Sequence, residues 1–171
     1  MKKSTVYRAV SVIAVIFWMA VIFWFSSKVA KESDAMSDGL IAKMTVLFGF
    51  ELSGEALLEF ISKWQFLVRK AAHFTEYAVL GFLLSNAFNS FGLFSKRWAF
   101  LSPAVSLLYA VSDELHQYFV PGRACRFLDI LIDFCGAAVG IGLFWASLSI
   151  VMTVAKRRKR HRQGGQLKRE S

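Results

Sequence analysis

The sequence predicts an all-α integral membrane protein, a four-helix bundle with an amphipathic helical outer segment between helices one and two. Three observations predict this class. The chain of 171 residues is 56% hydrophobic, and its mean hydropathy is positive, so it is more apolar than an ordinary soluble domain. Its apolar residues gather in stretches long enough to cross a bilayer. Charged and turn-forming residues separate these stretches.

The first apolar stretch is predicted to be a retained membrane anchor over about residues 9–27. No residue in this range is charged, and Arg8 and Lys28 flank it. A helix of this length spans about 30 Å, the thickness of the hydrocarbon layer. The stretch is longer than the apolar core of a secretory signal peptide and is rich in Phe and Trp.

Residues 28–65 are predicted to form the amphipathic outer segment. Their apolar side chains recur at helical spacing in two pieces, which Gly49 and Gly54 separate. Such stripes are typical of helices that lie on a bilayer or against a bundle.

Three further spans are predicted at about residues 66–88, 98–119 and 127–155. Lys96 and Arg97 precede the third span, and Pro121 and Gly122 end the helix before the fourth. Residues 1–155 are thus expected to form one transmembrane domain. The basic residues of 156–171 are expected to form a disordered cytoplasmic tail against anionic headgroups.

The fourth span contains a small-residue pattern. Gly136 and Gly140 lie four residues apart with Ala137 alongside, which lets membrane helices approach closely. Packing within the bundle is the favoured use, and dimerisation is the alternative.

The distribution of charge predicts the orientation of the chain. With four spans, both termini lie on one side, together with most Lys and Arg residues but only Glu170 among the acids. Lys and Arg are enriched on the cytoplasmic side of membrane proteins, so both termini are predicted to be cytoplasmic. This arrangement also explains the net charge of +9, and we expect no nucleic acid as a partner.

Ionisable residues gather where the second span begins, the third ends and the fourth begins, and all three places face outward in this topology. Such residues are costly in a membrane and are therefore candidates for a functional site. The catalytic candidates are His73, Glu76, Asp113, Glu114 and His116. The ligand-binding candidates are Arg69, Lys70, Gln117, Arg123, Asp129 and Asp133.

Three interpretations of this cluster stay open. It can be a self-satisfied network that ties helix ends together. It can be a catalytic site in which a carboxylate and His73 or His116 exchange protons while Arg123 holds an anionic group such as a lipid phosphate. It can also recognise or transport an amphiphilic ligand without chemistry.

No metal site and no cofactor are assigned from the sequence. His73 with Glu76, and Glu114 with His116, offer nitrogen and oxygen ligands, but neither spacing is a specific metal signature. The chain has no Gly-x-Ser-x-Gly motif, no Walker loop and no dinucleotide fingerprint.

At these residues the sequence resembles the VanZ-like family of small bacterial membrane proteins. The matching pieces are Phe25-Ser26-Ser27; Arg69-Lys70 with His73, Glu76, Tyr77, Leu80 and Gly81; Ser112-Asp113-Glu114, His116-Gln117, Phe119 and Pro121-Gly122-Arg123; and Asp129, Asp133, Gly136 and Gly140. The combined pattern covers about residues 6–145. Asp133 stands where the family often has Asn.

The resemblance implies a bacterial inner-membrane protein of the cell envelope. The family takes its name from a protein linked to low-level resistance to teicoplanin, a lipidated glycopeptide. We therefore expect an outward-facing polar site that binds an anionic lipid or a lipid-linked ligand and contributes to glycopeptide resistance. The expected partners are membrane lipids, with a lipid-linked envelope precursor or a lipoglycopeptide as further candidates. The alternatives are a membrane enzyme that acts by acid/base chemistry on a lipid-linked envelope substrate and a structural polar network.

Overall fold

The computed structural model describes residues 4–50, 52–93 and 99–167, and these form five α-helices and no strand. The helices are α1 (Thr5–Ser26), α2 (Ala30–Leu47), α3 (Gly54–Ser90), α4 (Leu101–Tyr118) and α5 (Phe127–Leu167). The all-α class is therefore confirmed. Among the described residues, Thr5–Ser26 and Phe127–Arg158 are the two helical stretches long and apolar enough to cross a membrane.

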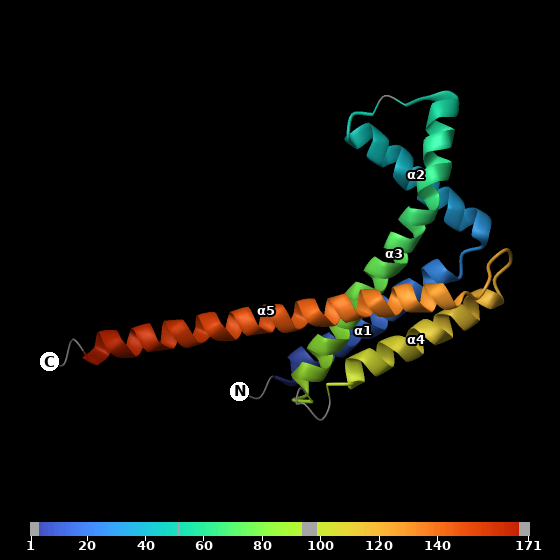
Figure 1. Ribbon diagram of the computed structural model, residues 1–171. Helices are drawn as coiled ribbons and strands as arrows, with labels where there is room; N and C mark the ends of the chain where they lie inside the picture. Colours follow the sequence, from blue (N-terminus) through green and yellow to red (C-terminus); the bar gives the residue numbers. More distant parts are fainter. Residues whose placement is uncertain (1–3, 51, 94–98, 168–171) are drawn as a thin grey trace.

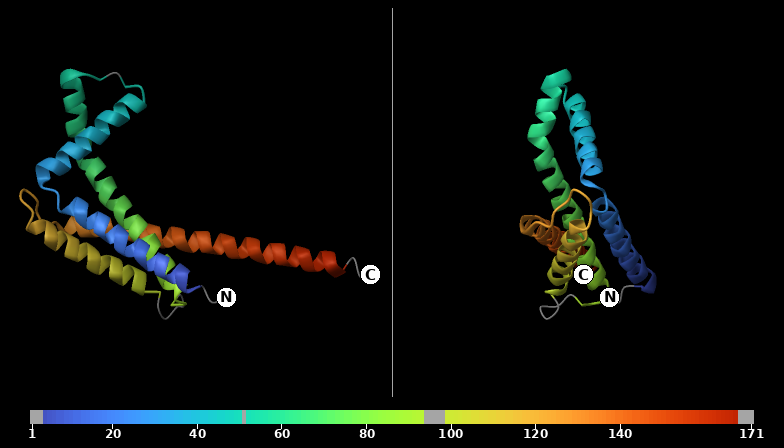
Figure 2. Two further views of the ribbon diagram at one scale, coloured as in Figure 1. Left: turned by 180° about the vertical axis from the view of Figure 1, so that it is seen from behind. Right: turned by 90° about the vertical axis from the view of Figure 1, so that its right-hand side faces the viewer.

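Helices α1 and α4 and the first part of α5 lie along one direction, and α3 crosses them (Figure 1). Helix α2 and the first half of α3 project away from this group, as the other views in Figure 2 also show. The beginning of α1 and the far end of α5 lie toward the same side, and the connections α1–α2 and α4–α5 lie at the opposite end. The chain therefore brings the polar ends of several helices to one end of the molecule.

Two helices are longer than predicted. The second predicted span is the later part of α3, which begins at Gly54 and includes the second amphipathic piece. The break lies before Gly54, where Gly49 and Gly54 have positive φ, and no proline interrupts the chain from there to Ser90. Helix α5 continues to Leu167, through most of the tail expected to be disordered, because Lys, Arg and Gln are good helix formers. Lys96, Arg97 and Trp98, which belong to the predicted start of the third span, lie outside the described residues.

Glycines allow α3 and α5 to cross in close contact. A Cβ added at Gly136 would overlap the backbone of Phe74, and one added at Gly140 would overlap the backbone of Ala78. The small-residue pattern thus serves packing within the chain. Because the crossing lies close to His73, it places the beginning of α5 against the middle of α3.

Helix α1 is fixed to its neighbours by partly buried hydrogen bonds and by apolar contacts. Trp18 Nε1 donates to the backbone oxygen of Glu76 at 2.8 Å, and the Tyr109 hydroxyl donates to the backbone oxygen of Met19 at 2.7 Å. The apolar core consists of Val15, Ile22, Tyr77, Leu80, Leu84, Ala87, Ala110 and Ala137. Three of these side chains are alanines, which allow the helix backbones to approach one another closely.

Candidate functional site

Six of the predicted site residues are buried; Asp129 is paired with Lys70, and the other five form one group between helices. Helix α3 supplies His73, α4 supplies Asp113, Glu114 and Gln117, and α5 supplies Asp133. We call these five residues the polar centre. The side chains of Glu114 and Asp133 are fully buried, and those of the other three are at most 8% exposed. Such a concentration of buried ionisable groups is costly unless each is paired or neutralised.

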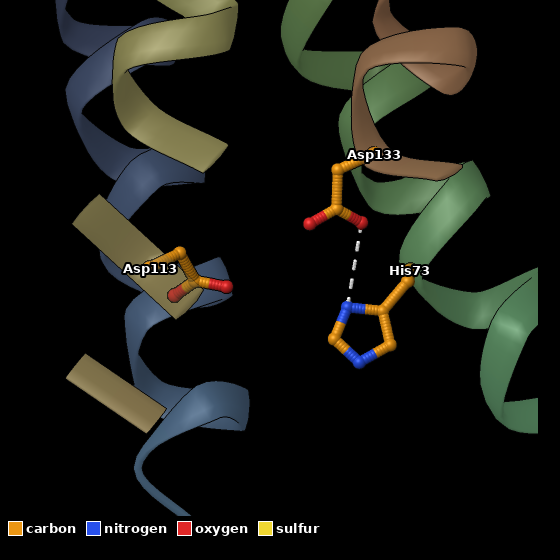
Figure 3. Close-up of side chains that lie close together, drawn as sticks. All are labelled: His73, Asp113 and Asp133. Atoms are coloured by element: carbon orange, nitrogen blue, oxygen red, sulfur yellow. Dashed lines mark ion pairs between the residues drawn. The ribbon is translucent and has the colours of Figure 1, made fainter. Parts of the chain in front are cut away.

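The innermost group of the polar centre is His73, Asp113 and Asp133. One oxygen or nitrogen atom from each lies within 4.8 Å of the others. His73 Nδ1 is 3.5 Å from Asp133 Oδ1, and Figure 3 shows both carboxylates facing the imidazole. Three different helices thus contribute one ligand-type side chain each to the same small volume.

A chain of hydrogen bonds orients Asp113. Its Oδ2 atom accepts hydrogen bonds from Ser26 Oγ at 2.9 Å and from Gln117 Nε2 at 3.2 Å. Gln117 Oε1 in turn accepts one from Arg123 at 2.9 Å. Arg123 is therefore linked through Gln117 to the polar centre. Ser26 was not among the predicted site residues, and the available signal was its place in the Phe25-Ser26-Ser27 piece.

Glu114 serves mainly to hold the connection between α4 and α5. Its Oε2 atom accepts the backbone N–H of Arg126 at 2.8 Å, while the Arg126 side chain is exposed. Glu114, a predicted catalytic candidate, is thus buried at the site, but its hydrogen bond is to the backbone of the turn that follows α4.

Two of the predicted cations are occupied by ion pairs. Lys70 pairs with Asp129, which joins α3 to the beginning of α5. Arg69 pairs with Asp34 of α2, a residue that sequence reasoning missed. Asp34 carried no signal beyond its place in an amphipathic helix. These two pairs tie helices together and remove two positive charges from those available to the polar centre.

His116 lies apart from the innermost group. Its Nε2 atom is 3.2 Å from Ser27 Oγ, and its ring lies against Phe23 of α1 with centroids 4.6 Å apart. The structure therefore separates the two histidines, and His73 is the one that meets the buried carboxylates.

A cavity of about 250 Å³ lies beside the polar centre, and we call it the main cavity. Its polar lining consists of Ser26, Lys28, Ser33, Ser37, Arg69, His73, Glu76 and Arg123, and its apolar lining of Phe25, Met36, Leu40, Val68 and Ala72. A smaller cavity of about 70 Å³ shares Arg69, His73 and Arg123 with it. Burial, and then the positive charge of Arg69, lower the pKa of Arg123 below its ordinary value, but a guanidinium keeps its charge at neutral pH.

Several buried atoms of this region have no hydrogen-bond partner within the described part of the chain. They are the hydroxyl of Tyr77, Oδ1 of Asp113, Oε1 of Glu114 and both carboxylate oxygens of Asp133. Buried polar atoms in proteins almost always have a partner. These atoms therefore indicate that the site binds something further: a proton, water, an ion or a ligand.

The described chain is all-helical and has a buried, acid-rich centre. Two of its helices are long and apolar enough to cross a membrane, so its class is that of helical proteins with candidate membrane spans. The model of the VanZ/LLP1 family matches residues 11–151, and the chain belongs to that family. This confirms the resemblance found in its motifs. Comparison with curated proteins gives no match, and comparison with solved structures gives none either.

Proposed function

We propose that the chain is a multi-pass protein of the bacterial cell membrane whose outward-facing polar site binds an anionic lipid or a lipid-linked ligand. The observation that carries the proposal is the main cavity, which places the guanidinium of Arg123 beside apolar side chains. Arg123 forms no ion pair with a described residue and suits an anionic headgroup, whereas Lys28 and Arg69 also line the cavity but pair with Glu32 and Asp34. The apolar lining suits the adjoining hydrocarbon.

The distribution of exposed side chains supports a membrane location. Large apolar side chains face outward along the helices, among them Ile13, Phe17, Leu108, Leu115, Leu143 and Ile150. Charged groups of the polar centre are buried instead. We propose four spans, which include parts of α3 and α4, with both termini in the cytoplasm because Lys and Arg accumulate on that side.

A second hollow fits the hydrocarbon part of such a ligand. An apolar groove of about 350 Å³ lies between α2 and the beginning of α3, lined by Ile41, Met44, Thr45, Phe48, Phe50, Phe60, Trp64 and Val68. Val68 lines both this groove and the main cavity. A headgroup in the cavity would therefore have an apolar path beside it for an acyl chain.

Family membership suggests the setting in which this binding matters. The family suggests a membrane protein linked to glycopeptide resistance. Membrane lipids, a lipid-linked envelope precursor or a lipoglycopeptide each combine an anionic or polar head with a hydrocarbon chain. We propose these as the ligand classes.

An acid/base enzyme is the second candidate function. His73 and Glu76 line the main cavity together with Arg123, so a proton-transferring pair and an anion-binding group border the same space.

The first prediction concerns Arg123. Arg123→Ala is expected to weaken binding of an anionic phospholipid by about tenfold or more, because one charge-assisted contact contributes at least about 1.4 kcal/mol. Native mass spectrometry of the protein in detergent, titrated with phosphatidylglycerol, measures this. Lys63→Ala, which removes a cation from an exposed position on α3, is the matched control.

Equal lipid affinity for Arg123→Ala and wild type would refute this assignment. Incubation of wild-type protein with a lipid-linked envelope precursor separates the two functions. A covalent change in the precursor that Glu76→Gln abolishes would replace simple binding with catalysis.

A further inference from the structure

We propose that His73, Asp113 and Asp133 together bind one divalent metal cation. Neither the spacing of these residues nor any motif predicted such a site. The structure brings one side chain from each of α3, α4 and α5 into a group whose ligand atoms lie within 4.8 Å of one another. This inference goes beyond the proposed lipid binding, since a cation can bind here without lipid.

The charge balance of the group favours a cation. Asp113 and Asp133 are at most 3% exposed. Asp133 lies 3.5 Å from the imidazole of His73, and Asp113 lies within 4.8 Å of the same group of ligand atoms. Lys70 is paired with Asp129, and Arg123 reaches Asp113 only through Gln117. Two buried carboxylates without a full cationic partner are unfavourable. A divalent cation would neutralise both.

The unpartnered atoms are an independent observation that points the same way. Oδ2 of Asp133 and Oδ1 of Asp113 are buried without a hydrogen-bond partner among the described residues, and Oδ1 of Asp133 and Nδ1 of His73 have only each other, at 3.5 Å. Each is an atom that a metal ion can use as a ligand. The other oxygen of Asp113 is held by Ser26 and Gln117, as supporting hydrogen bonds hold the ligands in metal sites.

The donor set indicates the class of metal. One imidazole nitrogen with two carboxylates suits a hard, oxygen-preferring ion of the Mn²⁺ or Mg²⁺ type. These ions prefer about six ligands, so water or an oxygen from a ligand would complete the shell. His73 also lines the main cavity. A cation at this group would therefore add positive charge next to the space proposed for an anionic headgroup.

The test uses the full chain, purified in detergent through a tag without histidine and stripped with a chelator. It is titrated with MnCl₂, and free Mn²⁺ is counted by electron paramagnetic resonance. Wild type is expected to bind about one Mn²⁺ per chain. His73→Ala and Asp133→Ala are each expected to weaken binding by at least about tenfold. Asp38→Asn is the control, since Asp38 lies on α2 and bonds to Gln65.

Folding is checked by melting temperature in the same detergent. Asp133→Ala removes a buried carboxylate that pairs with His73 only when the imidazole is protonated, so without metal it should keep a single cooperative unfolding transition. Mn²⁺ should raise the melting temperature of wild type and Asp38→Asn but not of Asp133→Ala.

Two results would overturn the inference. One is wild-type binding of less than about 0.1 Mn²⁺ per chain at millimolar concentration. The other is unchanged binding in both alanine variants. Mn²⁺ binding is measured without added lipid, and phosphatidylglycerol binding is measured without added Mn²⁺, so failure of the metal site and failure of lipid binding give different results.

Discussion

The buried carboxylates of this chain differ in role because their neighbours differ. Asp129 is neutralised by Lys70, and Glu114 accepts a backbone N–H from the turn after α4. Asp113 and Asp133 face His73 and keep oxygens without partners in the described chain. Residues of one chemical type thus divide into two that hold helices together and two that remain available for an ion or a ligand.

Gln117 is expected to hold Asp113 and Arg123 in position, because it forms a hydrogen bond with each of them. Gln117→Leu should lower the free energy of unfolding by about 1–3 kcal/mol, because it leaves Arg123 and Asp113 without their shared partner. Thermal unfolding in detergent measures this change. Ser112→Ala, at an exposed position on the same helix, should change the melting temperature little, and an equal loss in both variants would contradict the role given to Gln117.

At the scale of elements, the crossing of α3 and α5 positions the site. The glycines of α5 let its backbone touch that of α3, and this contact brings Asp129 and Asp133 to Lys70 and His73. A larger residue at the crossing would move one helix and separate these pairs. Close packing is therefore a condition for the polar centre and not only for stability.

Gly140→Ala is expected to destabilise the protein by about 1–3 kcal/mol, because the new Cβ would overlap the backbone of Ala78. Gly142→Ala is the matched control on the same helix, since a Cβ at Gly142 meets nothing within 4 Å. The control should be neutral or slightly stabilising, because alanine favours helix over glycine. Equal melting temperatures for the two variants would show that the crossing tolerates a methyl group.

At the scale of the whole molecule, large apolar side chains lie on the outer surface of the helices and polar side chains line a cavity at one end. Apolar residues such as Phe17, Leu108 and Leu143 face outward, whereas the main cavity lies among cations, a histidine and a carboxylate. The connection between α4 and α5 lies at the same end as the connection between α1 and α2. The proposed topology puts this end outside the cell.

Cys125, which is exposed in the α4–α5 connection, tests this orientation. With Cys135 replaced by Ser, a membrane-impermeant maleimide should label Cys125 in intact cells whose outer barrier, where present, has been opened. A second variant with Ser171→Cys as its single cysteine should be labelled only after the cell membrane is permeabilised. The reverse pattern would place the polar site on the cytoplasmic side and refute the proposed orientation.

Much of the architecture follows from local chemistry. Hydropathy and spacing predicted helices that α1, α4 and the first part of α5 match closely. For α1 and α5 the reason is a continuous apolar length that is visible in the chain. The motif around residues 112–123 predicted the family and the end of α4. Helices α3 and α5 are longer than the sequence predicts, because the amphipathic segment before α3's apolar part and the basic segment after α5's apolar part favour helix and continue it.

The sequence by itself determined the helical class, the family and the set of polar residues that meet at one end of the molecule. Only the tertiary structure decided the partners: Arg69 with Asp34, Lys70 with Asp129, Ser26 with Asp113, and His73 between two carboxylates. The physical reason is that helical periodicity places a side chain on a face of its own helix. Which atom it meets depends on how closely and at what angle another helix crosses that face, and residues distant in sequence set that crossing.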